Sequence, residues 1–408
     1  MGFGSVAMLA GPVPPGAAGC CRRLLAGALA AGLRPLLRGL PPCWVTPRRA
    51  AGQWPSPGLR VPEAAEAEQL VQQVKHTGVA VRRFIACPRL ARTVQRCLQR
   101  GASRGSQPVL LECGPGPGVL TRTLLNAGVR VVALESNPAF LPNLQSLENS
   151  LDGQLKVIYA DFCRLDPLTG AVKPPAVCSE KLFETVGVAA VPWKADTPVR
   201  IFGILPQSKE RLILWRHLFA LYERSSIYRY GRAELNIFIS EREYKILTGK
   251  PGSAGSYQAI TVLCQLGYEI QLLHMEPWSS FFTNLKNGGL AIPKSVRLPN
   301  DHLCLVRLTP QQNLFTGGLN PKNSPIFVFM VKQCLAKPKS RLIDRLNSWS
   351  LDNGSQLLRE LEIPENAQTR NVYPEDYKRL FEALQSSTIF TENWWHEEVF
   401  ENTRNINF

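Results

Sequence analysis

The sequence predicts an α/β fold, with a Rossmann-like parallel sheet followed by a small C-terminal helical domain. Short apolar runs, each long enough for one buried strand, alternate with helix-like segments between residues 108 and 308. Such an alternation is typical of a parallel sheet covered by helices on both faces. A glycine-rich turn joins the first strand to the first helix, as Rossmann-like sheets require. From about residue 310 the pattern turns helical.

The first 62 residues differ in composition from the rest of the chain. They contain no lysine and no acid, and the first carboxylate is Glu63. Their seven arginines contribute +7 to the formal net charge of +15: Arg22, Arg23, Arg34, Arg38, Arg48, Arg49 and Arg60. An arginine-rich, acid-free start rich in Ala and Leu is typical of a removable mitochondrial presequence, with a basic nucleic-acid-binding tail as the alternative. The longest apolar run there, 24–33, is too short to span a bilayer, so no membrane insertion is expected.

The segment "PRLARTVQRCLQR" (88–100) predicts an amphipathic helix with a basic face. Its arginines are spaced by three or four residues and share one side: Arg89, Arg92, Arg96 and Arg100. Its apolar residues fall on another side: Leu90, Val94 and Leu98. No acid lies between residues 75 and 104, so we predict a face that binds nucleic-acid phosphates. An ordinary solvated face is the alternative.

The remaining elements follow in order. Strands are expected at 108–113, 130–136, 155–162, 198–205 and 233–241, with two more near 268–276 and 302–308. One helix follows the first strand and ends at Gly128, and Pro138 opens the next. The link 163–198, rich in Pro and Gly, is predicted to be an insertion loop. Three helices are expected in the C-terminal part, at 339–349, 355–363 and 374–385. The predicted domains are a presequence (1–62), a sheet domain (63–310) and a helical domain with a tail (311–408).

The turn "LLECGPGPGVLTRTLL" indicates a ligand site. Gly114, Gly116 and Gly118 lie between the first strand and its helix, where a glycine lets the backbone approach a ligand closely. The dinucleotide fingerprint needs a further glycine at position 119, which is Val119, so an NAD-dependent enzyme is disfavoured. The spacing favours S-adenosyl-L-methionine instead, and hence the sheet of S-adenosylmethionine-dependent methyltransferases.

Two carboxylates follow the next strands. Glu135 ends the second strand, where it could accept from both ribose hydroxyls of that cofactor. Asp161 ends the third strand, where it could accept from the adenine amino group. Ligands bind outside the carboxyl ends of such strands. Ordinary loop carboxylates are the alternative.

With these motifs the chain resembles the ribosomal RNA adenine N6-dimethyltransferases, from about residue 79 to 310 and through the helical domain. The motifs that carry the resemblance are "RRFIACPRLA" (82–91), "LLECGPGPGVLT" (110–121), "VVALES" (131–136), "VIYADF" (157–162) and "ELNIFISEREYKIL" (234–247). The first of them implies that Ile85 lines the cofactor pocket. The stretches "HMEPWSSF" (274–281), "QNLFT" (312–316) and "KPPA" (173–176) resemble a mitochondrial subgroup of transcription factors.

The catalytic motif of that family is altered here. "FGILPQ" (202–207) stands where active members have F-G-N-L-P-Y, so Leu205 and Pro206 match. The Asn oxygen and the Pro carbonyl accept the hydrogens of the adenine amino group, and the aromatic ring stacks on the flipped base. Ile204 has no acceptor and Gln207 has no ring, and the loss of one such contact costs on the order of 10²–10³ in rate. No residue is therefore predicted as a confident catalyst, and any methyltransferase activity is expected to be weak or residual.

The resemblance implies two functions. The first is a transcription initiation factor of the mitochondrial matrix nucleoid, acting with the mitochondrial RNA polymerase to melt promoter DNA and hold its single strand. The alternative is an active adenine N6-dimethyltransferase of the mitochondrial small-subunit rRNA, and one protein could hold both roles. The eleven cysteines include no CxxC pair, so no metal site is predicted.

Overall fold

The computed structural model describes residues 56–73, 82–100, 108–167, 172–283, 302–349 and 354–385. All of these residues belong to one compact unit, Arg48–Phe408. Most of the predicted presequence and the C-terminal tail therefore lie outside the described residues. No helix within the described ranges is both long and apolar enough to cross a membrane.

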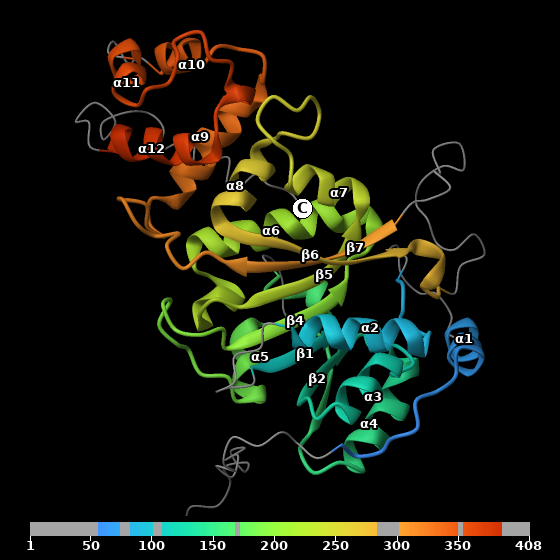
Figure 1. Cartoon of the computed structure of the whole chain (residues 1–408). Coiled ribbons are helices and arrows are strands. Elements are labelled where there is room, and N and C mark those ends of the chain that lie inside the picture. The colour runs from blue at the N-terminus through green and yellow to red at the C-terminus, as the bar shows by residue number, and fades with distance from the viewer. Residues whose placement is uncertain are drawn as a thin grey trace, which may run out of the picture. The chain divides into compact units, whose positions relative to one another are not determined.

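One seven-stranded sheet forms the centre of this unit, with the order β3-β2-β1-β4-β5-β7-β6 (Figure 1). Its strands are β1 (Val109–Cys113), β2 (Val131–Glu135), β3 (Leu155–Tyr159), β4 (Val199–Ile204), β5 (Glu234–Ser240), β6 (Tyr268–Pro277) and β7 (His302–Pro310). Strands β1 to β5 pair in parallel, and β7 runs antiparallel to both β5 and β6. The Rossmann-like α/β prediction is confirmed, with β7 as the exception to a fully parallel sheet.

Both faces of the sheet are covered, which explains why its central strands are mostly apolar. In β2, Val131 and Ala133 belong to one hydrophobic cluster, while Val132 and Leu134 belong to the other. Successive side chains of a strand point to opposite faces, so a doubly covered strand needs apolar residues at every position. The first cluster contains side chains of α1 (Ala64–Gln73), α2 (Pro88–Gln99), α3 (Val119–Asn126) and α4 (Leu141–Asn149). The second contains those of α5 (Ser179–Val186), α6 (Glu210–Glu223), α7 (Glu241–Leu247) and α8 (Ala259–Gly267).

The link between β3 and β4 corrects one prediction. We expected an insertion loop over 163–198, but this segment contains α5. Leu182 and Phe183 of α5 are buried, and the Phe183 ring stacks on Tyr230 with centroids 4.3 Å apart. The flanking prolines and glycines concealed a short amphipathic helix, because two turns give little periodicity to detect.

The C-terminal part is helical, as predicted. It contains α9 (Ser324–Ala336), α10 (Leu342–Ser348), α11 (Gly354–Glu360) and α12 (Pro374–Gln385). The sequence did not indicate α9, because it is apolar on nearly all sides and so lacks a helical alternation. Phe327 of α9 lies between Tyr222 of α6 and Phe381 of α12, at centroid distances of 5.8 and 5.2 Å. The hydrophobic cluster is thus continuous across the predicted boundary at residue 310.

Candidate functional site

The glycine loop between β1 and α3 adopts a conformation that favours glycine. Gly114, Gly116 and Gly118 have φ values of 70°, 58° and 74°, all in the left-handed region. At Gly116 a Cβ atom would also clash with the ring of Phe84. The loop is therefore fixed both by its own backbone and by the close approach of that ring.

Glu135 holds this loop onto the end of β2. Its Oε2 accepts from the backbone N–H of Gly116 at 2.9 Å, and its Oε1 accepts from those of Ser136 and Asn137 at 2.8 and 2.7 Å. The side chain is fully buried, and this burial raises the pKa of the carboxyl while the three N–H groups oppose the rise. In this conformation its oxygens are directed at the backbone, so none of them is exposed to accept from a ribose.

Asp161 also has partners within the chain. Its Oδ2 accepts from Arg82 Nη2 at 2.7 Å, and its Oδ1 accepts from the backbone N–H of Cys163 at 2.9 Å. Arg82 donates in addition to the Ser136 hydroxyl. Arg164 approaches the same carboxylate at 3.9 Å. The predicted adenine acceptor is thus engaged by an arginine from the segment that precedes α2.

Residues 82–84 form what we call the cover segment. Arg82 reaches Ser136 and Asp161, beyond the ends of β2 and β3. The Phe84 ring lies against Gly116 and packs edge-on against Phe140 at 5.3 Å. The Phe84 backbone exchanges two hydrogen bonds with Phe282, of 2.9 and 3.0 Å. The cover segment therefore lies across the carboxyl ends of β1, β2 and β3, where a ligand of a Rossmann-like fold would bind.

A cavity of about 200 Å³ lies beside the cover segment. Gly114 and Asp161 line it together with the altered motif Ile204, Leu205 and Pro206. The structure thus brings two of the predicted cofactor residues and three residues of the altered motif to one cavity, whereas the other predicted cofactor residues do not line it: Ile85, Gly116, Gly118 and Glu135. Its charged lining residues are four cations and one carboxylate: Arg82, Arg83, Arg164, Lys209 and Asp161.

Comparison with known proteins decides the family. The model of the ribosomal RNA adenine dimethylase family matches residues 92–386, well over half of the chain. The chain belongs to the ribosomal RNA adenine dimethylase family. The family implies an S-adenosylmethionine-dependent methyltransferase scaffold, which confirms the predicted fold class.

Curated relatives in this family cover most of the chain. The dimethyladenosine transferase 2, mitochondrial, of Bos taurus is 44% identical over 321 residues, which are 78% of this chain and 81% of the relative. The protein of the same name from Homo sapiens is 39% identical over 352 residues, 85% of this chain and 87% of the relative. Among solved structures, a dimethyladenosine transferase from Plasmodium falciparum matches with a TM-score of 0.49 and 13% identity, covering 73% of this chain and 96% of that one.

S-adenosylmethionine, the methyl donor implied by the family, does not fit the site in this conformation. Glu135 is fully buried, Phe84 fills the space above Gly116, and the cavity is smaller than the roughly 300–1,000 Å³ of typical ligand sites. Ile85, expected to line the pocket, is 4% exposed and lies in the hydrophobic cluster below the cover segment instead. Binding of the donor would require the cover segment to move.

The altered acceptor motif lies where the sequence predicted it. Ile204 is the last residue of β4, and Pro206 precedes a turn of 3-10 helix that leads into α6. The Gln207 side chain accepts from Arg83 Nη2 at 3.4 Å, so its amide oxygen is turned toward the cover segment. Ile204, which lines the cavity, has no side-chain acceptor of its own.

The basic face of α2 has the predicted geometry. Leu90, Val94 and Leu98 are buried. The four arginines are exposed: Arg89, Arg92, Arg96 and Arg100. Within the described residues, only Arg89 of these comes within 4.0 Å of a carboxylate, that of Glu276. The face is therefore largely free of carboxylate partners, as a phosphate-binding surface requires.

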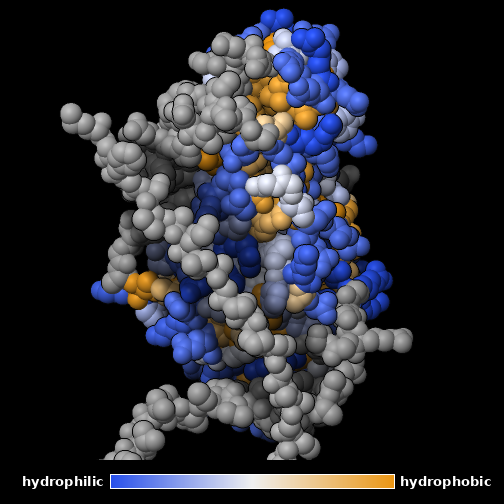
Figure 2. All heavy atoms as spheres, turned by 90° about the vertical axis from the view of Figure 1, so that its left-hand side faces the viewer, coloured by the Kyte–Doolittle hydropathy of each residue, from blue (hydrophilic) through white to orange (hydrophobic). Residues whose placement is uncertain are grey.

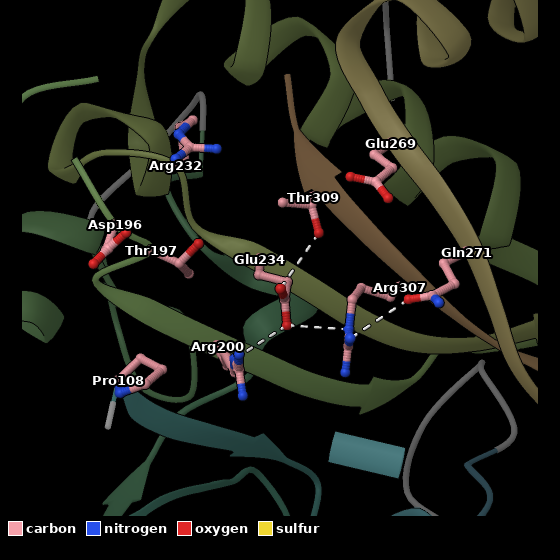
Figure 3. Close-up of a pocket in the computed structure, with 10 residues that line it drawn as sticks. All are labelled: Pro108, Asp196, Thr197, Arg200, Arg232, Glu234, Glu269, Gln271, Arg307 and Thr309. Carbon is pink, nitrogen blue, oxygen red and sulfur yellow. Dashed lines mark hydrogen bonds and ion pairs between the residues drawn. The ribbon is translucent and has the colours of Figure 1, made fainter. Parts of the chain in front are cut away.

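A second cavity, of about 270 Å³, lies at the opposite edge of the sheet and was not predicted. Figure 2 looks onto the side where the parallel strands begin, and the middle of that face is hydrophilic and hollowed. At its centre Glu234 Oε1 lies 3.2 Å from Arg200 Nε and 3.4 Å from Arg307 Nε (Figure 3). Arg200 Nη1 donates to the carbonyl of Leu98, and Arg307 Nη2 to that of Cys97.

We name Arg200, Glu234 and Arg307 the arginine clamp. It binds the last carbonyls of α2, where the helix dipole is negative, and so fixes α2 to β4, β5 and β7. The sequence signals the clamp only by one charged residue in each of three mostly apolar strands. That pattern does not by itself predict that the three charged side chains meet. Within the described ranges, no group of three or more His, Cys, Asp and Glu could hold a metal ion.

Proposed function

We propose that the chain is a mitochondrial transcription initiation factor on an rRNA adenine dimethyltransferase scaffold. It would act with the mitochondrial RNA polymerase and bind the single-stranded region of promoter DNA. The observation that carries the proposal is Ile204, an apolar side chain at the position where the active family holds the acceptor adenine. A scaffold that keeps the family fold but lacks this contact is better suited to binding nucleic acid than to modifying it.

The basic face of α2 is the proposed nucleic-acid surface. Its exposed arginines have a spacing that allows several phosphates to be contacted along one strand: Arg89, Arg92, Arg96 and Arg100. The arginine clamp holds the helix rigidly against the sheet, so the face is pre-formed before the strand arrives.

Methyl transfer is a second candidate, because the donor-side motifs are complete. When bound, S-adenosylmethionine would supply an electrophilic methyl group. We propose that, once the cover segment has moved, it would be held by the glycine loop and the two carboxylates, with Ile85 nearby: Gly114, Gly116, Gly118, Glu135 and Asp161. Leu205 and Pro206 keep the backbone of the acceptor motif. The substrate would be an adenine of the mitochondrial small-subunit rRNA, and the rate would be low.

The proposed location is the mitochondrial matrix, at the nucleoid. The relatives are named as mitochondrial, and the acid-free start of the chain fits a transit peptide. The Leu59 backbone exchanges two hydrogen bonds of 2.7 Å with the Asn126 side chain of α3. These contacts favour an end of the transit peptide before Leu59, within the predicted 1–62.

The deciding experiment measures both activities on one purified protein. We expect promoter-dependent transcription with the mitochondrial RNA polymerase, and little methylation of a small-subunit rRNA fragment. The variant Ile204→Asn restores the missing acceptor, and it should raise methylation by up to about 10²-fold without changing transcription. Strong methylation by the unmodified chain, with no effect on transcription, would favour the dimethyltransferase instead.

A further inference from the structure

We propose that the cavity beside the cover segment binds an anionic nucleotide rather than S-adenosylmethionine. The base would enter the apolar interior, and the phosphate would lie at the mouth against Arg82, Arg164 and Lys209. This goes beyond the proposed function, since it gives the former donor site a ligand of its own that requires neither polymerase nor promoter.

The charge of the lining is the first argument. Four cations and a single carboxylate line the cavity, which leaves a clear excess of positive charge. Arg164 is 64% exposed and touches Asp161 only at 3.9 Å, and Lys209 is exposed with no carboxylate within ion-pair distance among the described residues. S-adenosylmethionine carries a net positive charge through its sulfonium, so these cations repel it. A phosphate is attracted by the same groups.

The shape of the site is the second argument. In a Rossmann-like fold the backbone of the glycine loop approaches the ligand closely, and Phe84 fills this space above Gly116. What remains open extends from Gly114 past Asp161 to Ile204. This remainder would take a base, with its sugar and phosphate toward the mouth, whereas the methionine chain of the donor would meet the Phe84 ring.

The interior is suited to a base. Apolar side chains of β2, β4 and β5 and of the segments that follow β3 and β4 line it: Leu134, Phe162, Ile201, Ile204, Leu205 and Ile237. Phe162 is itself fixed by stacking on His217, with ring centroids 5.0 Å apart. A base inserted here would exchange water for apolar and aromatic contacts, which stabilise it whatever its identity.

Arg82 can bind the phosphate without giving up its present partners. A guanidinium has five N–H groups, and the structure shows one donating to Asp161 and one to Ser136. The ion pair with Asp161 fixes the side chain at the mouth of the cavity, so the phosphate would meet a pre-organised donor.

The test is calorimetric titration of the full chain with adenosine 5′-monophosphate, adenosine, inorganic phosphate and S-adenosylmethionine. We expect the monophosphate to bind about tenfold more tightly than adenosine or S-adenosylmethionine, and phosphate alone to bind more weakly than the monophosphate. Arg164→Ala and Lys209→Ala, both exposed and so compatible with folding, should each weaken the monophosphate about two- to fivefold. Arg359→Ala, an exposed arginine of α11, is the control and should change nothing.

Competition distinguishes a free nucleotide from one within a strand. Displacement of the monophosphate by a short single-stranded oligonucleotide would identify the ligand as part of a strand, and a failure to displace it would identify a free nucleotide. The proposal is overturned if S-adenosylmethionine binds more tightly than the monophosphate, or if neither Arg164→Ala nor Lys209→Ala weakens it. These titrations contain no polymerase. The nucleotide proposal can therefore be overturned while the proposed transcription function holds, and the transcription function can be overturned while the nucleotide still binds.

Discussion

At the scale of single residues, the least expected group is Glu112 in β1. It is 2% exposed, and its Oε2 accepts from the Thr121 hydroxyl at 2.7 Å. Burial raises the pKa of Glu112 to about 8, so the folded chain holds a proton that the unfolded chain releases near pH 4.3. Between these values the folded state binds more protons than the unfolded state, and the free energy of unfolding therefore falls as pH rises.

This predicts a pH effect that Glu112→Gln removes. From about pH 6.5 to 8, the unmodified chain should lose about 1–2 kcal/mol of stability relative to Glu112→Gln, whose amide keeps the acceptor for Thr121 without titrating. Burial lowers the pKa of His217 to about 3, which gives the opposite dependence only below about pH 6.5. Burial also raises the pKa of Glu210 to about 7, but both proteins share that group. Urea unfolding at three pH values measures the difference, and two parallel curves would contradict it.

At the scale of elements, the arginine clamp determines how α2 is held. Glu234 is the carboxylate between Arg200 and Arg307, and it also accepts from the side chains of Asn236 and Thr309. Replacing it with alanine leaves two largely buried guanidinium groups without that charge. We expect Glu234→Ala to lower the free energy of unfolding by roughly 3–5 kcal/mol.

A matched control is available in the same cavity. Glu269 lines it but is exposed, so Glu269→Ala removes the same charge from the same place at little cost in stability. Chemical unfolding of both variants gives the comparison. Equal stabilities would show that the clamp contributes no more than a surface charge, and that α2 is held by its apolar face alone.

The same helix shows what the sequence could and could not predict. The two faces of α2 followed from a spacing of three and four residues, because helical periodicity is a local property. The clamp joins Leu98 to Arg200 and Cys97 to Arg307, more than a hundred residues apart, which no local pattern contains. Strands β1 to β7 were likewise found as apolar runs, while the reversed direction of β7 depends on pairing.

Part of the candidate site was likewise predictable from the local sequence, and part of it was not. Motif spacing predicted where the glycine loop, Glu135 and Asp161 lie, because each follows a strand end. It did not predict that Asp161 would pair with Arg82, 79 residues earlier, or that Phe84 would cover Gly116. Those contacts depend on how the cover segment folds back over the sheet.

At the scale of the whole molecule, the C-terminal helices and the sheet should unfold together. Phe327 is fully buried and joins α9 to Tyr222 on one side and Phe381 on the other. We expect Phe327→Ala to lower the free energy of unfolding by about 3–5 kcal/mol. Fluorescence and circular dichroism should still report one common unfolding transition. Tyr373→Ala, at a side chain that is 61% exposed, is the control. Two separate transitions would show that residues beyond 310 unfold as an independent domain.

On the intact chain, charge reversal can distinguish strand binding by the basic face of α2 from strand binding at the cavity beside the cover segment. Arg92→Glu with Arg96→Glu reverses two exposed charges of the basic face, and log affinity for single-stranded DNA should then depend less steeply on log salt, by roughly 0.7 per lost contact. Promoter-dependent transcription should fall with it. Arg359→Glu with Arg379→Glu makes the same change in net charge on α11 and α12, and should leave both measurements nearly unchanged. Arg82→Ala should also spare strand binding, because it frees Asp161 at the carboxyl edge of the sheet without touching the basic face of α2. If Arg82→Ala abolished strand binding and the α2 variant did not, the nucleic acid would bind at the cavity, and the arginines of α2 would be an ordinary solvated face.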